Sequence, residues 1–242
     1  MRTFVLAAGL GTRLQPLTNN RPKALVEING TTLLEIVVTK LLNYGFNQII
    51  INVHHFADQI IDFLNSKNNF GIDITISDER EKLLDTGGGL KNVSCFFNDG
   101  KPFLVHNVDV LTNIDLGKLI SSHKSEEQIA TLAVQKRKSS RYFLFDEEKN
   151  LCGWENTTTG EKKITRIAKG ELEQLAFSGI QIAEPELFNL MPGDKVFSIV
   201  DFYLSIASNY RITYFDHTDS VFVDLGKKEN LIEAEKILNK II

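Results

Sequence analysis

Short apolar runs alternate with amphipathic segments along the first half of the chain. The compact run Thr3–Ala7 is typical of a buried strand. Apolar residues recur at helical spacing across Thr31–Tyr44, where Thr32 followed by Glu35 predicts a capping box. Further elements are expected as strands at Gln48–Val53, Ile72–Ser77 and Pro102–Asn107, and as helices near Phe56–Asn65 and through Lys91–Phe96. This alternation favours a parallel sheet with helices on both faces.

The alternation becomes less regular after Asp115. The patterns predict helices at Leu116–His123 and Ser198–Ser208, and strands at Ile129–Gln135, Arg141–Phe145, Leu151–Trp154, Leu175–Ala183 and Val221–Val223. The tail, Lys227–Ile242, is expected to be a docked helix whose apolar face carries Leu231, Ala234, Leu238 and Ile241. The predicted fold class is therefore α/β, a Rossmann-like doubly wound and mostly parallel sheet with a β-rich addition in the second half.

Composition narrows the class of protein. With 242 residues and 43% hydrophobic positions the chain can bury a substantial core, and its formal charge of −4 argues against a basic nucleic-acid surface. Two cysteines cannot form a disulfide framework or a four-cysteine zinc site. No run approaches the ~20 apolar residues that span a bilayer, and the apolar N-terminus is too short for a signal peptide. We expect a soluble cytoplasmic protein, with no nucleic-acid or membrane partner, as a monomer or small homo-oligomer.

The segment after the first strand carries the clearest chemistry. Gly9 and Gly11 let the backbone approach a ligand and turn its N–H groups toward an anion, and Arg13 and Lys23 add cations that suit phosphate oxygens. The P-loop pattern is absent, and the dinucleotide fingerprint fails because Leu14 stands where glycine is needed. An ordinary tight turn with exposed cations is the alternative, and the spacing of Arg13 and Lys23 weighs against it.

The run LAAGLGTRLQPLT…RPKALV resembles the opening of sugar-1-phosphate nucleotidyltransferases, the nucleoside-diphosphate-sugar pyrophosphorylases. The resemblance continues at Asp85–Gly89, Phe103–Asp109, Phe177–Ile180 and Val223–Gly226, and thus covers nearly the whole chain. Within this family, the chain most resembles the N-acetylmuramate 1-phosphate uridylyltransferase branch, because it carries the triple glycine and is short.

This resemblance implies a single nucleotidyltransferase domain over residues 1–242, with a nucleotide-binding half (1–110), an acceptor-sugar half (111–226) and a C-terminal docked helix (227–242). It implies a Mg²⁺-dependent coupling of a nucleoside triphosphate, UTP in that branch, to a sugar 1-phosphate, with pyrophosphate as the second product. The implied metal ligands are Asp109 and Asp224, and the implied sugar contacts are Asn107, Ser178 and Gly179. The implied nucleotide contacts are Leu6, Ala7, Ala8, Gly9, Gly11, Thr12, Arg13, Lys23, Thr86, Gly87 and Gly88, with Arg13 and Lys23 also catalytic.

The residues agree with this chemistry on independent grounds. A phosphate monoester has a second pKa near 6, so the attacking group is already an anion and needs no general base. The difficulty is to bring two polyanions together, which cations and positioning overcome. Mg²⁺ is typically bound through one or two carboxylates together with substrate phosphates. Asp109 and Asp224 each follow a predicted strand and are expected to face one crevice, although an aspartate there is often only a turn former.

Two departures from the family pattern keep other functions open. Val108 replaces the usual glycine before the metal aspartate, and Glu155-Asn156 stands where many relatives carry Glu-Lys-Pro. Lys162 or Lys163 on the next strand could substitute for that lysine, but the favoured interpretation is that both are solvated surface lysines. The alternatives are a phosphocholine cytidylyltransferase, a metal-dependent glycosyltransferase and a catalytically silent nucleotide-binding regulator. In the glycosyltransferase, Asn107-Val108-Asp109 would be the acidic motif that follows a strand. Pyrophosphate release separates the leading hypothesis from the last two.

Overall fold

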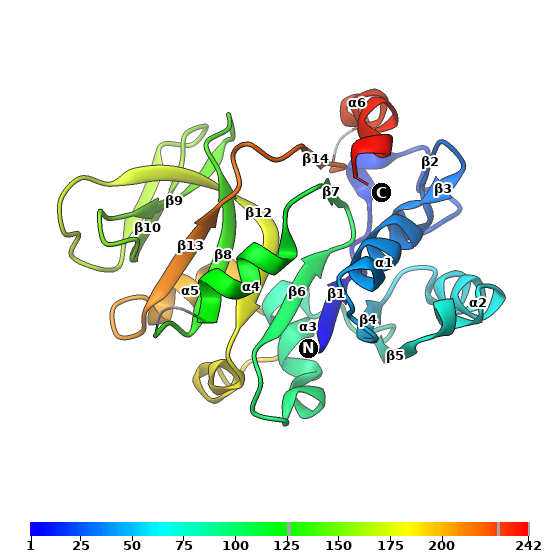
Figure 1. Cartoon of the computed structure of the whole chain (residues 1–242), viewed down its shortest axis with the longest axis horizontal. Coiled ribbons are helices and arrows are strands. Elements are labelled where there is room, and N and C mark those ends of the chain that lie inside the picture. The colour runs from blue at the N-terminus through cyan, green and yellow to red at the C-terminus, as the bar shows by residue number, and fades with distance from the viewer. Residues whose placement is uncertain (125–126, 227, 242) are drawn as a thin grey trace. The chain divides into compact units, whose positions relative to one another are not determined.

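The computed structural model describes residues 1–124, 127–226 and 228–241, and the chain divides into two compact units. Unit 1 comprises Met1–Leu84, Phe103–Ile114 and Ser220–Ile242, and unit 2 comprises Asp85–Pro102 and Asp115–Asp219. Each unit is therefore assembled from segments that are distant in sequence (Figure 1). Among the described residues, every helix is too short or too polar to cross a membrane.

Unit 1 is built on parallel strands in the order β6 (Phe103–Asn107), β1 (Thr3–Leu6), β4 (Gln48–Val53) and β5 (Asp73–Asp78). Helix α1 (Leu33–Asn43) lies across one face of this sheet, and α2 (Ala57–Ser66) connects β4 to β5 (Figure 1). Smaller elements are β2 (Glu27–Ile28) with β3 (Thr31–Thr32), β7 (Val110–Thr112) with β14 (Phe222–Asp224), and α6 (Glu229–Ile237). Because the central strands are parallel, their carboxyl ends meet at one edge.

The C-terminal helix packs on the core of unit 1. Ala234, Leu238 and Ile241 are buried, and Leu231 is packed against the same apolar cluster, as the predicted apolar face requires. The cluster also contains Leu14, Val26, Ile28, Leu33, Ile36, Leu111, Val223 and Leu225. Burial of these side chains holds the first and last segments of the chain together.

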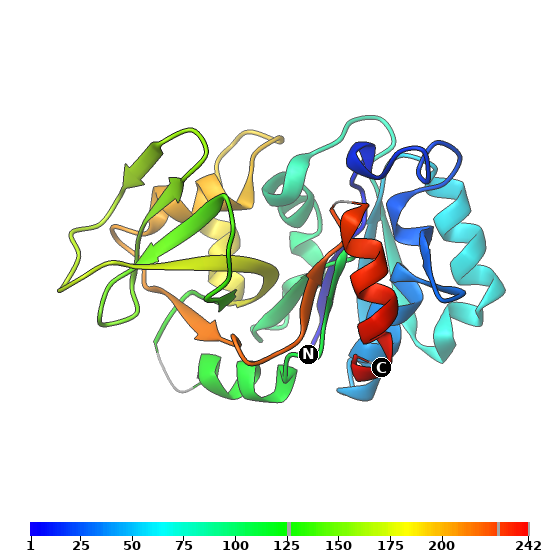
Figure 2. The same cartoon turned by 90° about the horizontal axis from the view of Figure 1, so that it is seen from above.

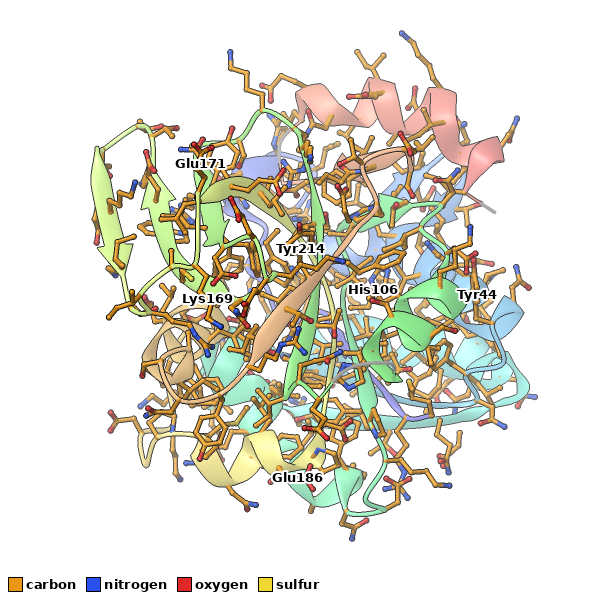
Figure 3. The ribbon with its side chains drawn as sticks, turned by 60° about the vertical axis from the view of Figure 1, so that its left-hand side comes forward. Tyr44, His106, Lys169, Glu171, Glu186 and Tyr214 are labelled. Carbon is orange, nitrogen blue, oxygen red and sulfur yellow. The ribbon has the colours of Figure 1, made fainter. Side chains whose placement is uncertain are left out.

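Unit 2 is rich in antiparallel strands. Its pairings join β11 (Glu161–Ile164), β10 (Leu151–Asn156), β9 (Arg141–Phe145), β12 (Glu173–Ala183) and β8 (Ala130–Gln135) in that order, and β13 (Ile212–Asp216) adds parallel to β8. Its helices are α3 (Asp85–Asn92), α4 (Leu116–Lys124) and α5 (Ile199–Ile206) (Figure 2). Tyr214 on β13, labelled in Figure 3, packs edge-on against Phe145, with ring centroids 4.7 Å apart.

The α/β fold class is confirmed, and most predicted elements lie within a residue or two of their expected bounds. The capping box is confirmed in its main contact, since Glu35 N–H donates to Thr32 Oγ1 at 3.2 Å. The short strands β2, β3, β7, β11 and β13 were not predicted, because runs of two to five residues carry little periodicity.

The helix expected at 91–96 is misplaced. Helix α3 instead begins at Asp85 and contains all three glycines of the Asp85–Gly89 motif. Its first turn packs against Phe197, a tertiary contact that overrides the low helix propensity of glycine. The predicted tail helix is also shorter than expected, and positions 227 and 242 lie outside the described residues.

We predict that Thr32→Ala lowers the free energy of unfolding by about 1 kcal/mol, because it removes the hydroxyl that accepts the Glu35 N–H at the start of α1. Urea denaturation followed by circular dichroism measures the change. Thr32→Ser keeps the acceptor and is the control. Equal stability of the alanine and serine variants would show that the cap contributes nothing.

Candidate active site

The loop after β1 presents a row of backbone N–H groups. Within the described part of the chain, no protein atom accepts a hydrogen bond from the N–H groups of residues 9–13. Gly11 has φ +67°, and a Cβ there would lie 2.9 Å from Thr18 Cγ2, so this position requires glycine for the loop itself. A Cβ on Gly9 would meet no protein atom within 4 Å, so the fold alone does not require glycine there.

Two carboxylates come together at the ends of paired strands. Strand β14 pairs antiparallel with β7, with Asp224 opposite Val110. The Leu225 N–H donates to the Asp109 carbonyl oxygen at 2.9 Å, which places residues 109 and 224 side by side. Both aspartates are partly exposed. The pair therefore offers hard oxygen ligands of the kind that Mg²⁺ prefers.

Each aspartate has a cation beside it. The Lys23 ammonium forms an ion pair with Asp109 Oδ2, and the lysine side chain is only 9% exposed. The Arg13 guanidinium and the Asp224 carboxylate both lie against Gly226. A Cβ on Gly226 would stand 2.9 Å from both Arg13 Nη2 and Asp224 Oδ1. The basic side chains of the N-terminal loop therefore point toward the two carboxylates, as the sequence hypothesis requires.

His106, one residue before Asn107 on β6, is buried and plays no acid–base part here (Figure 3). Burial, together with the charge of the nearby Lys40, lowers the pKa of His106 to about 3. Its Nδ1 bonds to the Asn107 carbonyl oxygen at 2.8 Å. A ring that is neutral throughout the physiological range cannot serve as a titrating base near neutrality, which agrees with a reaction that needs none.

Val108 fits its position without strain. It is buried, is absent from the residues with positive φ, and its N–H donates to Leu6 O at 3.1 Å. A β-branched side chain is therefore compatible with the turn between β6 and β7. The departure from the family's glycine leaves the backbone before Asp109 in ordinary geometry.

Asn52 and Glu79, at the carboxyl ends of β4 and β5, were missed by the sequence reasoning. Asn52 Oδ1 accepts the N–H groups of Ala7 at 2.6 Å and Ala8 at 3.2 Å. Asn52 Nδ2 donates to Glu79 Oε1 at 2.8 Å. One signal in the sequence could have revealed this pair. Asn52 stands inside the apolar run QIIINV, and a buried asparagine needs a hydrogen-bond partner.

In unit 2, the glycines at the start of α3 pack against Phe197. The N–H groups of Gly87 and Gly88 donate to Phe197 O at 2.9 and 3.2 Å, and Thr86 Oγ1 accepts the Ile199 N–H at 3.0 Å. A Cβ on Gly87 would collide with the Phe197 ring. Close packing within unit 2 thus accounts for Gly87, and nucleotide contact by residues 86–88 stays a prediction.

The predicted sugar contacts Ser178 and Gly179 form a β-bulge in unit 2. The register of β12 against β8 shifts between Phe177 and Gln181, and Gly179 has φ +70°. Ser178 is buried and its Oγ bonds to His217 Nε2 at 2.8 Å. Asn107, the third predicted sugar contact, is half-buried at the end of β6 in unit 1. A sugar role for these residues stays a prediction.

The lysines that could replace the missing Glu-Lys-Pro lysine lie on the exposed strand β11. Lys162 pairs with Glu155 at 3.6 Å, and Lys163 pairs with both Glu161 and Asp201 at 3.4 Å. These are solvated surface ion pairs, which are weak and easily exchanged. Lys162 and Lys163 therefore do not support an acceptor-phosphate site on β11.

Comparisons with known proteins find a matching family and several relatives. Residues 2–240 match the family described as Nucleotidyl transferase. The N-acetylmuramate alpha-1-phosphate uridylyltransferase of Caulobacter vibrioides is 32% identical over 215 residues, which are 86% of this chain and 85% of that protein. The UTP–glucose-1-phosphate uridylyltransferase of a Synechocystis species is 29% identical over 97% of this chain, which spans 62% of that longer relative.

A solved structure described as a putative glucose-1-phosphate thymidylyltransferase from Bacillus anthracis has a TM-score of 0.83 with 19% identity. It covers all of this chain, and 96% of its own length is matched. At this identity the likeness establishes the shared fold.

We predict opposite outcomes at two glycines. Gly9→Ala changes the free energy of unfolding by less than about 0.5 kcal/mol, because the new methyl group meets no protein atom, yet raises the KM for a nucleoside triphosphate at least about tenfold. Gly87→Ala lowers the free energy of unfolding by about 1–3 kcal/mol, because its methyl group collides with Phe197. Thermal melts and pyrophosphate release measure the two effects. Unchanged kinetics for Gly9→Ala would contradict close approach of a ligand to that loop.

Proposed function

Because this chain belongs to the nucleotidyl transferase family, we propose that it couples UTP to N-acetylmuramate 1-phosphate, giving the UDP-sugar and pyrophosphate. The coarser activity, sugar-1-phosphate nucleotidyl transfer, follows from the family and its uridylyltransferase relatives. The finer choice of UTP and N-acetylmuramate 1-phosphate rests on the sequence motifs and on the relative from Caulobacter vibrioides.

The reaction exchanges one phosphoanhydride bond for another. An oxygen of the sugar phosphate bonds to the α-phosphorus of the triphosphate, and the bond from that phosphorus to the bridging oxygen of the β-phosphate breaks. The leaving pyrophosphate keeps the electron pair of the broken bond. No proton has to be removed from the attacking phosphate, because its oxygen is already an anion near neutral pH. Catalysis therefore depends on holding two polyanions in line and stabilising charge on the transferring phosphoryl group.

Arg13 and Lys23 supply the protein's share of that charge. The Arg13 guanidinium can fork onto two phosphate oxygens, and the nearly buried Lys23 ammonium acts as a point charge with little solvent screening. The N–H groups of residues 9–13 add oriented dipoles along the same loop.

Asp109 and Asp224 are the residues that would hold a divalent metal. Their carboxylates are partly exposed, come from paired strands, and carry the oxygen donors that Mg²⁺ requires. A bound Mg²⁺ would supply positive charge that stabilises the phosphate oxygens. The chain's own part is to fix both aspartates through the β7–β14 pairing and the Leu225 to Asp109 hydrogen bond.

The single observation that carries the proposal is the alternation of charge around this strand pair. Lys23 contacts Asp109, and Arg13 and Asp224 lie against the same glycine, Gly226. Such a site attracts both phosphates and metal. The proposed partners remain the two small substrates, without nucleic acid or membrane, and we place the enzyme in the cytoplasm as a monomer or small homo-oligomer.

A substrate panel tests the assignment. UTP, CTP, GTP and dTTP are each combined with N-acetylmuramate 1-phosphate, glucose 1-phosphate, mannose 1-phosphate and phosphocholine, with pyrophosphate release as the readout. The highest kcat/KM is expected for UTP with N-acetylmuramate 1-phosphate. A preference for another pair would replace the proposed substrates, and CTP with phosphocholine would favour the cytidylyltransferase. Release of UDP from UDP-sugars without pyrophosphate would favour a glycosyltransferase, and UTP binding without turnover a regulator.

We predict that Arg13→Ala and Asp109→Asn each lower kcat by about 10²–10³-fold, because both groups act on charge in the transition state. Asp73→Asn, an exposed aspartate at the amino end of β5, is the control and keeps full activity. Chelation with EDTA should abolish turnover, and added Mg²⁺ should restore it. Full turnover by Arg13→Ala or Asp109→Asn would contradict the assignment of the site.

A further inference from the structure

A buried polar pair lies directly beneath the loop that carries Arg13. Asn52 is 2% exposed and Glu79 is 3% exposed, although both have polar side chains. They stand at the carboxyl ends of adjacent strands, and β4 is paired to both β1 and β5. Burying a carboxylate costs several kcal/mol unless hydrogen bonds compensate, so a pair in this place requires an explanation.

Each atom of the pair has a partner of the correct polarity. Asn52 Oδ1 accepts from the Ala7 and Ala8 N–H groups, and Asn52 Nδ2 donates to Glu79 Oε1. Glu79 Oε2 accepts the Leu84 N–H at 3.2 Å. Because both loop N–H groups are donors, the orientation of the Asn52 amide is determined by its neighbours.

The pair also occupies the two N–H groups that directly precede the loop of residues 9–13. Ala7 and Ala8 are occupied by Asn52, whereas the N–H groups of residues 9–13 have no acceptor among the described residues. Along the backbone, Ala8 therefore carries the last N–H group that has an acceptor in Asn52, and residue 9 carries the first N–H group of the loop that has none among the described residues. Asn52 thereby fixes the point at which the backbone leaves β1 and begins to present donors to an anion.

We propose that Asn52, held by Glu79, is a positioning residue that sets the orientation of the loop of residues 9–13 for binding the triphosphate. The inference rests on the proposed function, since it takes that loop to be the nucleotide site. Asn52 acts through Ala7 and Ala8 and touches no substrate in this scheme. The effect is expected on nucleotide affinity, because a loop released from Asn52 must be ordered by the ligand itself.

The surroundings of Glu79 agree with a role that depends on hydrogen bonds. Burial raises the pKa of Glu79, while hydrogen bonds from Asn52 and Leu84 lower it, and the nearby His54 ring also favours the carboxylate. His54 Nδ1 bonds to the Glu79 carbonyl oxygen at 2.7 Å, so His54 belongs to the same cluster. Loss of the Asn52 amide would remove one of the contacts that keep this carboxylate ionised.

An exchange of the amide and the carboxylate tests the proposal. In Asn52→Asp, one carboxylate oxygen can still accept from Ala7 and Ala8, but the other faces Glu79 Oε1 with no proton between them. In Glu79→Gln, one amide cannot satisfy both Asn52 and Leu84. In the double variant, the amide nitrogen introduced at position 79 can donate to the carboxylate introduced at position 52, and the amide oxygen at position 79 can accept from Leu84. Every contact is then restored, with the polarity between the two side chains reversed.

Titration calorimetry with UTP and Mg²⁺ measures affinity, and pyrophosphate release separates KM from kcat. Each single variant is expected to raise the UTP Kd about tenfold, and the double variant is expected to return within about threefold of the wild-type value. The KM for the acceptor should change less than the KM for UTP. The Kd of Asn52→Asp relative to wild type should improve as pH falls, because a shared proton restores the contact to Glu79; the ratio to wild type cancels pH effects that both proteins share.

Asn150→Asp is the matched control. Asn150 in unit 2 is 5% exposed and its Nδ2 donates to the Asp146 carboxylate, so this variant also places two buried carboxylates in contact. It should lower the melting temperature and leave the UTP Kd unchanged. An unchanged UTP Kd in both single variants, or a double variant no tighter than the singles, would overturn the positioning role. Failure of the wild-type protein to bind UTP would overturn the proposed function instead.

Discussion

Two carboxylates, Asp109 and Asp224, are brought side by side by one short strand pairing, and they repel each other unless cations lie near them. The pairing of β7 with β14 sets the register, and Lys23 and Arg13 supply the opposite charge. In the nearly dry surroundings of Lys23 such a charge interacts more strongly than it would in water. The charges of these four side chains are therefore balanced without any ligand.

The apolar core of unit 1 supports this arrangement from beneath. Leu14, next to Arg13, packs in the same cluster as Leu225, next to Asp224, and the C-terminal segment adds Ala234 and Leu238. Segments at opposite ends of the chain are thus held by shared burial. The charged side chains project from backbone that is anchored by their apolar neighbours, which limits the entropy lost when a ligand is bound.

Glycine serves three different purposes in this chain. Gly11 allows a left-handed turn, Gly87 allows a helix to pack against Phe197, and Gly9 satisfies neither need and leaves open space beside the loop. Glycines in these two motifs thus report on backbone conformation at Gly11 and on packing at Gly87, and the fold requires neither at Gly9. Only the surroundings of each Cβ position distinguish these roles.

Much of the fold follows from local patterns, since the helix around Leu41 is long and periodic and the strands around Val5 and Ile50 are compact apolar runs. The candidate residues Arg13, Lys23, Asp109 and Asp224 were also visible, because cations near glycines and aspartates after strands are local signals. What the sequence could not determine is which distant groups meet. The pairing of Asp224 with Val110, the packing of Gly87 on Phe197 and the contact of Asn52 with Ala7 join residues far apart in the chain. These contacts depend on strand register and burial, which arise only when the whole chain packs, and for that reason the tertiary structure alone decided them.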